Sequence, residues 1–204
     1  MSSLKTAQAK VQPAKLQLDE IVRNIKTDYR DWNVFHTSGL PLVNDMAKTF
    51  GKCLTLMKNL QKKKTPRTHK IDKDRLKELR QSLKAPSEQL TQLVDRLFDA
   101  TEHTRENLLA LRQLCATNGE LYEYIFYRTW ELRDMLEFAE SIMRFYDAEY
   151  EIKEMVLDEL TSSKDHKELS FLRKAWREPR HALTAEFTAM FNEFHFETTE
   201  VKIE

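Results

Sequence analysis

The fold is decided by residues 16–60, LQLDEIVRNIKTDYRDWNVFHTSGLPLVNDMAKTFGKCLTLMKNL. Apolar residues recur here at alternating steps of three and four, which is the spacing of a long helix that packs along one face. Eleven of the thirteen seam positions are apolar or aromatic, and the seam consists of Leu18, Val22, Ile25, Tyr29, Trp32, His36, Gly39, Val43, Met46, Phe50, Cys53, Met57 and Leu60. Because the seam keeps its phase past Pro41, the pattern predicts one helix with a kink at 37–41.

Two further stretches show the same helical spacing. The first ends at Asn118-Gly119, a usual helix stop, and has a kink or short break expected at Pro86-Ser87. The second carries two adjacent apolar seams, so it needs neighbours on two sides. The sequence therefore predicts an all-α fold, an elongated antiparallel helical bundle or coiled coil of three long helices (about 16–61, 72–117 and 132–161) with two short C-terminal helices (about 165–177 and 181–195).

Composition limits both the domain count and the class of function. The 204 residues suffice for one domain, which we expect over 15–196, between a flexible lead-in at 1–14 and a flexible tail at 197–204. Only 3 residues are glycine, which disfavours glycine-rich phosphate loops. The net charge is zero, and no apolar run reaches the ~18 residues of a membrane span, so we expect no membrane contact. Cys53 and Cys115 lie on helical seams and are predicted to be buried thiols.

The sequence contains no arrangement of residues that supports catalysis. Its one Glu-x-x-His spacing, Glu178 to His181, encloses Pro179 and is therefore not helical, which argues against a di-iron bundle. The remaining histidines are scattered one to a segment, and no nucleophile elbow or phosphate loop is present. We therefore predict a protein that is not an enzyme and that has no cofactor and no metal.

A basic segment connects the first two long helices. From Lys58 to Arg80 there are ten Lys or Arg residues against three acids. Three interpretations stay open: a solvated connection, a contact with nucleic acid, or a nuclear-import patch made by Lys62, Lys63, Lys64 and Arg67. Thr65-Pro66 also forms a minimal proline-directed phosphorylation site.

The segment Leu121–Trp130, LYEYIFYRTW, lies between two helical patterns and lacks a helical period itself. Its aromatic residues cannot all point inward from one helix. Two interpretations remain: the segment plugs one end of the bundle, or it forms a surface on which a partner docks.

Three short elements, in the same order and spacing over residues 25–180, resemble the cyclin-dependent kinase 2-interacting protein family. Residues 25–32, IKTDYRDW, resemble its early Ile-Lys…Asp-Trp element. Residues 126–130, FYRTW, are similar to its Phe-His-Thr-Trp element. Residues 169–172, LSFL, followed by Trp176 and Pro179, resemble its Leu-Ser-x-Leu…Trp…Pro signature.

This resemblance implies a non-enzymatic adaptor associated with cyclin-dependent and origin-firing kinases and with replication-checkpoint signalling. It also implies a subunit of an AAA+ ATPase complex that acts in replisome proteostasis and in maturation of the large ribosomal subunit. We accordingly expect a nuclear protein with a cytoplasmic pool, and only indirect contact with nucleic acid. The residues expected to bind partners are Phe126, Tyr127, Thr129, Trp130, Leu169, Leu172, Trp176 and Pro179. The alternative is a coiled-coil structural subunit of another assembly, such as a tether or spindle complex.

Overall fold

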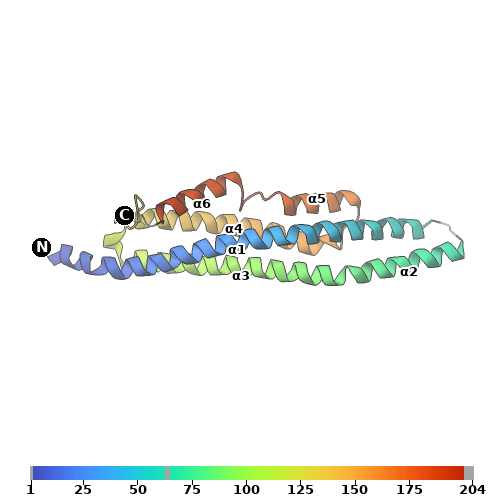
Figure 1. Cartoon of the computed structure of the whole chain (residues 1–204), viewed down its shortest axis with the longest axis horizontal. Helices are drawn as coiled ribbons and strands as arrows, with labels where there is room; N and C mark the ends of the chain where they lie inside the picture. The colour runs from blue at the N-terminus through green and yellow to red at the C-terminus, as the bar shows by residue number, and fades with distance from the viewer. Residues whose placement is uncertain (1, 63–64, 200–204) are drawn as a thin grey trace. The chain divides into compact units, whose positions relative to one another are not determined.

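The chain is all-helical. The computed structural model describes residues 2–62 and 65–199, with side chains from residue 9 onward. In chain order the helices are α1 (Ser2–Leu60), α2 (Pro66–Ser82), α3 (Lys84–Thr117), the 3-10 turn η1 (Gly119–Leu121), α4 (Leu132–Leu160), α5 (His166–Arg177) and α6 (Ala185–Glu197) (Figure 1). The strand-like pairing found in these ranges is an isolated antiparallel bridge between Ile125 and Glu131.

The contacts group the chain into two compact units. Unit 1 comprises Met1–Asn33, Asp99–Glu149 and Arg180–Glu204, and unit 2 comprises Val34–Phe98 and Tyr150–Pro179. Helices α1, α3 and α4 each contribute to both units. Hydrophobic periodicity reports which residues are buried along a helix, but not where along that helix the contacts separate into groups.

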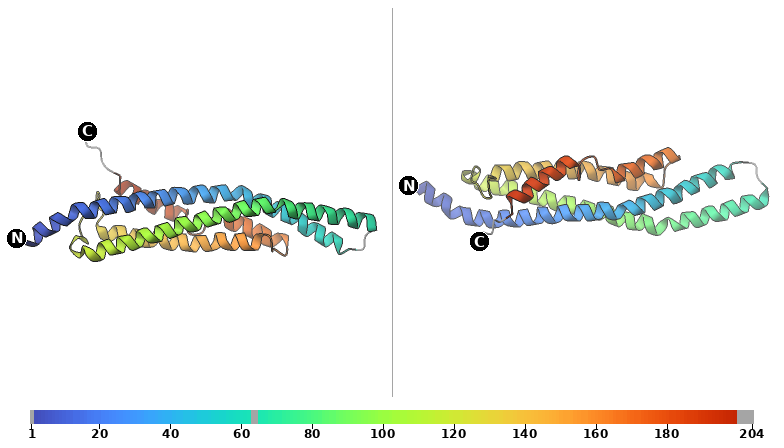
Figure 2. Two further views of the ribbon diagram at one scale, coloured as in Figure 1. Left: turned by 90° about the horizontal axis from the view of Figure 1, so that it is seen from below. Right: turned by 45° about the horizontal axis from the view of Figure 1, so that its top comes forward.

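Unit 1 is a small bundle in which the first half of α1 runs antiparallel to α3. Asn24 pairs with Asn107 and Asp28 with His103, so residue numbers rise along one helix as they fall along the other. Helix α4 packs on α1 through Trp32 and Tyr146, whose parallel rings are 4.9 Å apart. Helix α6 lies beside α4 (Figure 2), with the rings of Phe138 and Phe194 stacked at 4.2 Å.

Unit 2 uses the same antiparallel arrangement. Arg96 of α3 lies over the ring of Phe35, and Arg80 of α2 donates to the sulfur of Met57. Helix α5 packs against α1 and buries Leu169, Leu172, Ala175 and Trp176. The predicted seam residues Val43, Met46 and Cys53 are buried here.

The first helices begin earlier than the sequence predicted. Helix α1 starts at Ser2 and not near residue 16, because residues 4–12 contain strong helix formers and no glycine or proline. It remains helical through Pro41. Helix α2 starts at Pro66 and not near residue 72, since proline at the first helical position already has the required φ and needs no hydrogen-bond acceptor for an N–H.

Two other boundaries also differ from the prediction. The expected helix 72–117 is divided at Leu83, because Pro86 has no N–H to continue the hydrogen-bond ladder and is tolerated only in the first turn of α3. Helix α6 begins at Ala185 and not at 181. Leu183 has a positive φ of 65°, and the Thr184 hydroxyl caps the helix by accepting from the Phe187 N–H at 3.2 Å.

The first residues of the predicted flexible tail are part of the packed structure, because Glu197 and Thr198 are buried. Residues 200–204 of that tail lie outside the described residues.

Candidate protein-interaction sites

Residues 119–131, which we call the cap segment, fold back on themselves at one end of unit 1. The Phe126 N–H donates to the Trp130 carbonyl at 3.1 Å, and the Leu132 N–H donates to the Tyr124 carbonyl at 3.3 Å. Inside this turn Phe126 is buried. The Trp130 ring is half-buried, 5.6 Å from the ring of Phe138 and 6.1 Å from that of Phe194. These contacts place Trp130 against aromatic residues of α4 and α6 in unit 1, and the role of the segment as a plug stays a prediction.

Polar contacts hold the cap segment in place from two sides. The Tyr127 hydroxyl donates to Asp19 of α1 at 2.8 Å, and the Lys15 ammonium lies 3.9 Å from the centre of the Tyr127 ring. The Thr129 N–H donates to the Glu197 carboxylate of α6 at 2.8 Å. Sequence reasoning placed Glu197 in a loose tail and missed this contact, since nothing in the local pattern connects residues so far apart.

One edge of the cap segment is left uncovered within unit 1. Tyr124 is 44% exposed and Ile125 is 54% exposed, and we call this pair the exposed edge. Its backbone is fixed by the hydrogen bonds of the turn. A rigidly held aromatic and aliphatic pair is a favourable anchor for a protein partner, because little conformational entropy is lost when it is covered. Neither residue was among those predicted to bind a partner.

The predicted C-terminal partner-binding residues lie in the core of unit 2. Leu169, Leu172 and Trp176 are 3%, 1% and 0% exposed, and Pro179 is half-buried. A partner could contact the three buried side chains only after α5 had left α1. Their evident role is to attach α5.

Trp176 is hydrogen-bonded to two other helices. Its Nε1–H donates to the backbone carbonyl of His36 in α1 at 3.1 Å, and the ammonium group of Lys153 in α4 donates to the backbone carbonyl of Trp176 at 3.1 Å. Its indole lies against Gly39, at the point where the apolar seam of α1 has no side chain. The two exceptions in the predicted seam, His36 and Gly39, are thus the two positions that receive Trp176.

His36 is an unusual histidine for a helix surface. Its ring stacks parallel to Trp176 at 6.4 Å, and within the described residues its Nδ1 has no hydrogen-bond partner. Burial, and to a lesser extent the positive charge of Lys153, lowers the pKa of His36 to about 4. The imidazole is therefore neutral near pH 7 and serves as a packing group.

The basic segment is accessible where the structure describes it. Lys62 follows α1 and is exposed, and Arg67 is exposed in the first turn of α2; Lys63 and Lys64 lie outside the described residues. Thr65 is the exposed N-cap residue of α2, and its hydroxyl lies 3.0 Å from that of Thr68.

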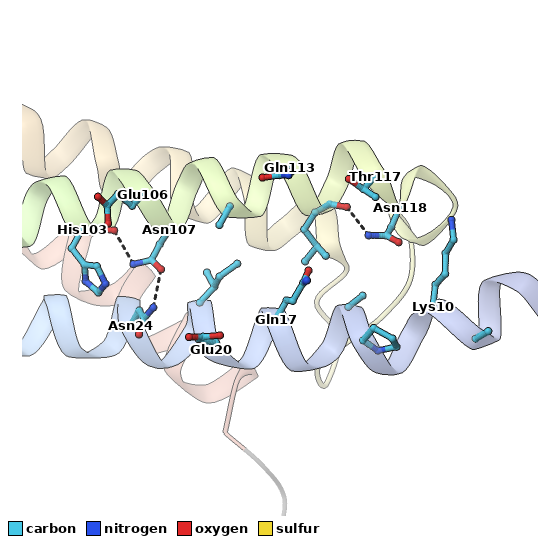
Figure 3. Close-up of a pocket in the computed structure, with 16 residues that line it drawn as sticks. Lys10, Gln17, Glu20, Asn24, His103, Glu106, Asn107, Gln113, Thr117 and Asn118 are labelled. Carbon is cyan, nitrogen blue, oxygen red and sulfur yellow. Dashed lines mark hydrogen bonds between the residues drawn. The ribbon is translucent and has the colours of Figure 1, made fainter.

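A polar groove of about 690 Å³ runs between α1 and α3 in unit 1 (Figure 3). Asn24 and Asn107 meet across it, with the Asn24 amide donating at 3.0 Å. Behind them Asp28 accepts from His103 at 2.7 Å and from the Thr104 hydroxyl at 3.0 Å. Burial raises the pKa of Asp28, although both hydrogen bonds oppose the rise. Since Asp28 is 4% exposed and already bonded, this cluster joins two helices and offers no carboxylate to a substrate.

Within residues 2–62 and 65–199, no group of three or more His, Cys, Asp or Glu side chains is placed to hold a metal ion. None of the helices in these ranges is both long and apolar enough to span a bilayer. Compared with protein-family models and with curated proteins, the chain finds no match.

Proposed function

We propose that this chain is a non-enzymatic adaptor subunit. It would link cell-cycle and replication kinases, or an AAA+ ATPase complex, to DNA replication, genome maintenance and biogenesis of the large ribosomal subunit. The observation that carries the proposal is the exposed edge, Tyr124 and Ile125, held rigidly beside the FYRTW element. The identity of the partners rests on the resemblance of that element and of the two others to the cyclin-dependent kinase 2-interacting protein family.

The arrangement of the three elements that carry the resemblance supports a scaffold and not a reactive centre. Each of the three elements supplies a tryptophan to a packed contact: Trp32 stacks on Tyr146, Trp130 meets Phe138, and Trp176 lies on Gly39. The apolar spacing over 16–60 further favours coiled-coil packing of the long helices in an elongated bundle, which small-angle X-ray scattering would test.

The proposal is tested by affinity capture of the full chain followed by mass spectrometry. The wild type should recover AAA+ ATPase subunits or replication kinases, and Ile125→Glu should lower that recovery. Leu109→Glu is the matched control, since Leu109 is 56% exposed on α3 of the same unit. Recovery of neither partner class by the wild type would overturn the proposal. Recovery of tether or spindle subunits in their place would support the alternative of a structural coiled-coil subunit.

We also propose that the basic segment directs nuclear import. A fluorescent fusion should lose nuclear accumulation when alanine replaces Lys62, Lys63, Lys64 and Arg67. The control removes four exposed basic residues, Lys164 just before α5 and Lys167, Lys174 and Arg177 within it. Equal nuclear signal in both variants would exclude the import patch.

A further inference from the structure

Unit 2 contains an open groove of about 640 Å³ between α1, α2 and α5. Its lining includes three aliphatic side chains that we call the aliphatic floor, Leu56 of α1 with Ile71 and Leu79 of α2. Ile71 is 58% exposed, a large apolar side chain that faces water in the isolated chain. The groove therefore offers apolar surface that a bound partner would cover.

Helix α2, which forms one wall, is poorly buried for its length. Of its 17 residues, all of them described, Leu76 is the buried one. Most helices in proteins are stabilised by packing an apolar face and not by intrinsic propensity. Helix α2 therefore buries little apolar surface for its length, and a partner bound in the groove beside it would bury more.

The opposite wall is rigid. Gly51 is buried, and a Cβ atom there would lie 3.2 Å from His166 Cε1, so α5 approaches α1 closely at this point. The Arg173 guanidinium donates to Asn44 of α1 at 2.9 Å, and Leu169 is buried between the helices. A wall that is already ordered loses little entropy when a ligand binds.

The charges around the groove have mostly one sign. Four basic side chains line it against one acidic side chain, Asp72, which gives its lining a net charge of +3; the four are Lys48, Lys52, Arg75 and Arg173. All four are exposed and come from the three different helices. An aliphatic floor with a basic rim matches a ligand that is aliphatic on one side and acidic on the other.

We propose that this groove binds an acidic amphipathic helix of a partner protein. The aliphatic residues of that helix, spaced at i, i+3, i+4 and i+7, would cover Ile71 and Leu79, and its Asp and Glu residues would face the basic rim. The inference deepens the adaptor function proposed above and rests on it, because it names the chemistry of one partner.

A nucleic acid fits the same groove less well. Proteins that bind single strands stack the bases on aromatic side chains, and no Phe, Tyr or Trp is among the described residues that line this groove. Phosphate groups would gain from the basic rim but leave the aliphatic floor uncovered, and Asp72 would repel them.

The inference is tested by selecting a phage-displayed library of random peptides of about 15 residues, or four helical turns, on the full wild-type chain and on Ile71→Asp. The wild type should enrich peptides with aliphatic residues at helical spacing and an excess of Asp and Glu. Ile71→Asp should not enrich them, whereas Phe171→Asp should, because Phe171 is 49% exposed in the same unit and does not line the groove. Circular dichroism would verify that all three proteins are equally helical.

An enriched peptide, synthesised with a fluorescent label, then gives the affinity. Charge reversal at Lys48 and Lys52 to Glu should weaken its binding by about tenfold or more, and added salt should weaken binding to the wild type. Three results would overturn the inference: enriched peptides without acidic excess, equal binding to Ile71→Asp, or tighter binding of single-stranded RNA or of a phosphopeptide lacking the apolar spacing. Self-association that Ile71→Asp abolishes would assign the groove to a second copy of this chain and would also overturn it.

Failure of this inference can be told apart from failure of the adaptor function. If no acidic helix binds but wild-type capture recovers the ATPase or kinase, the groove proposal alone is lost. If an acidic helix binds but neither partner class is captured, the groove stands and the adaptor assignment is lost.

Discussion

The indole of Trp176 lies directly on the backbone of Gly39, in the middle of helix α1. A Cβ atom at Gly39 would lie 2.7 Å from Cε2 of that indole and nearer still to Cζ2, so no other amino acid fits without movement of α5. Gly39 is fully helical and has no positive φ. It is therefore required by the approach of Trp176, and not by the backbone conformation.

We expect Gly39→Ala to destabilise the protein by about 2–3 kcal/mol, as overpacking of a filled core does. Gly119→Ala is the matched control, because a Cβ there meets nothing within 4 Å and its φ is also ordinary. That control should change stability by less than about 0.5 kcal/mol. Urea denaturation of the three proteins measures the difference. Equal stability of the two variants would show that Trp176 does not hold this position in solution.

Trp130→Ala should lower the free energy of unfolding by about 3 kcal/mol, because the ring contacts Phe138 and Phe194. Ile125→Ala, in the exposed edge of the same segment, should cost less than about 0.5 kcal/mol. Thermal melting followed by circular dichroism distinguishes the two. Loss of partner capture by Trp130→Ala with an unchanged melting temperature would instead identify Trp130 as a docking residue.

Thr104→Val should destabilise unit 1 by about 1–3 kcal/mol. The substitution keeps the shape of the side chain but removes a hydrogen bond to the buried Asp28 carboxylate. Thr27→Val is the control, since the Thr27 hydroxyl donates to the Arg23 carbonyl at an exposed position of α1. If both variants cost the same in urea denaturation, the Asp28 cluster does not hold α1 and α3 together.

His36 should make the protein sensitive to acid. Its pKa is about 4 in the folded chain and 6.5 when unperturbed, so between these values the unfolded chain takes up a proton that the folded chain does not. The free energy of unfolding should therefore rise with pH over this window and be unaffected by His36 above it. Because the ring is only partly buried, we expect a contribution of about 1–2 kcal/mol.

The measurement is the difference in stability between wild type and His36→Asn from pH 4 to pH 8. The difference in the free energy of unfolding between the two proteins should change between about pH 4 and pH 6.5 and be constant above about pH 7. His195→Asn, at an exposed site of α6, should leave the pH dependence of the wild type intact. An unchanged slope in His36→Asn would mean that another group causes the acid sensitivity.

Much of the helical architecture could be predicted from apolar spacing, because that spacing depends on burial along a single helix. The interruption of the seam at His36 and Gly39 could be noticed, but its cause lies in Trp176, far away in the sequence. The absence of a helical period around Phe126 correctly indicated a non-helical segment. Its contacts with Phe194 and Glu197 of α6 could not be predicted, because no local pattern connects those residues to the segment. The start of α6 was missed because it follows the positive φ of Leu183.

The division of the chain has a consequence for its synthesis. Unit 1 is built from three separate stretches of sequence, Met1–Asn33, Asp99–Glu149 and Arg180–Glu204, and unit 2 from the two stretches between them. During translation, every residue of unit 2 leaves the ribosome before Arg180 does, so unit 2 can complete its contacts while unit 1 still lacks α6. The first half of α1 can by then pair with α3 and α4, and α6 adds its aromatic residues to unit 1 afterwards.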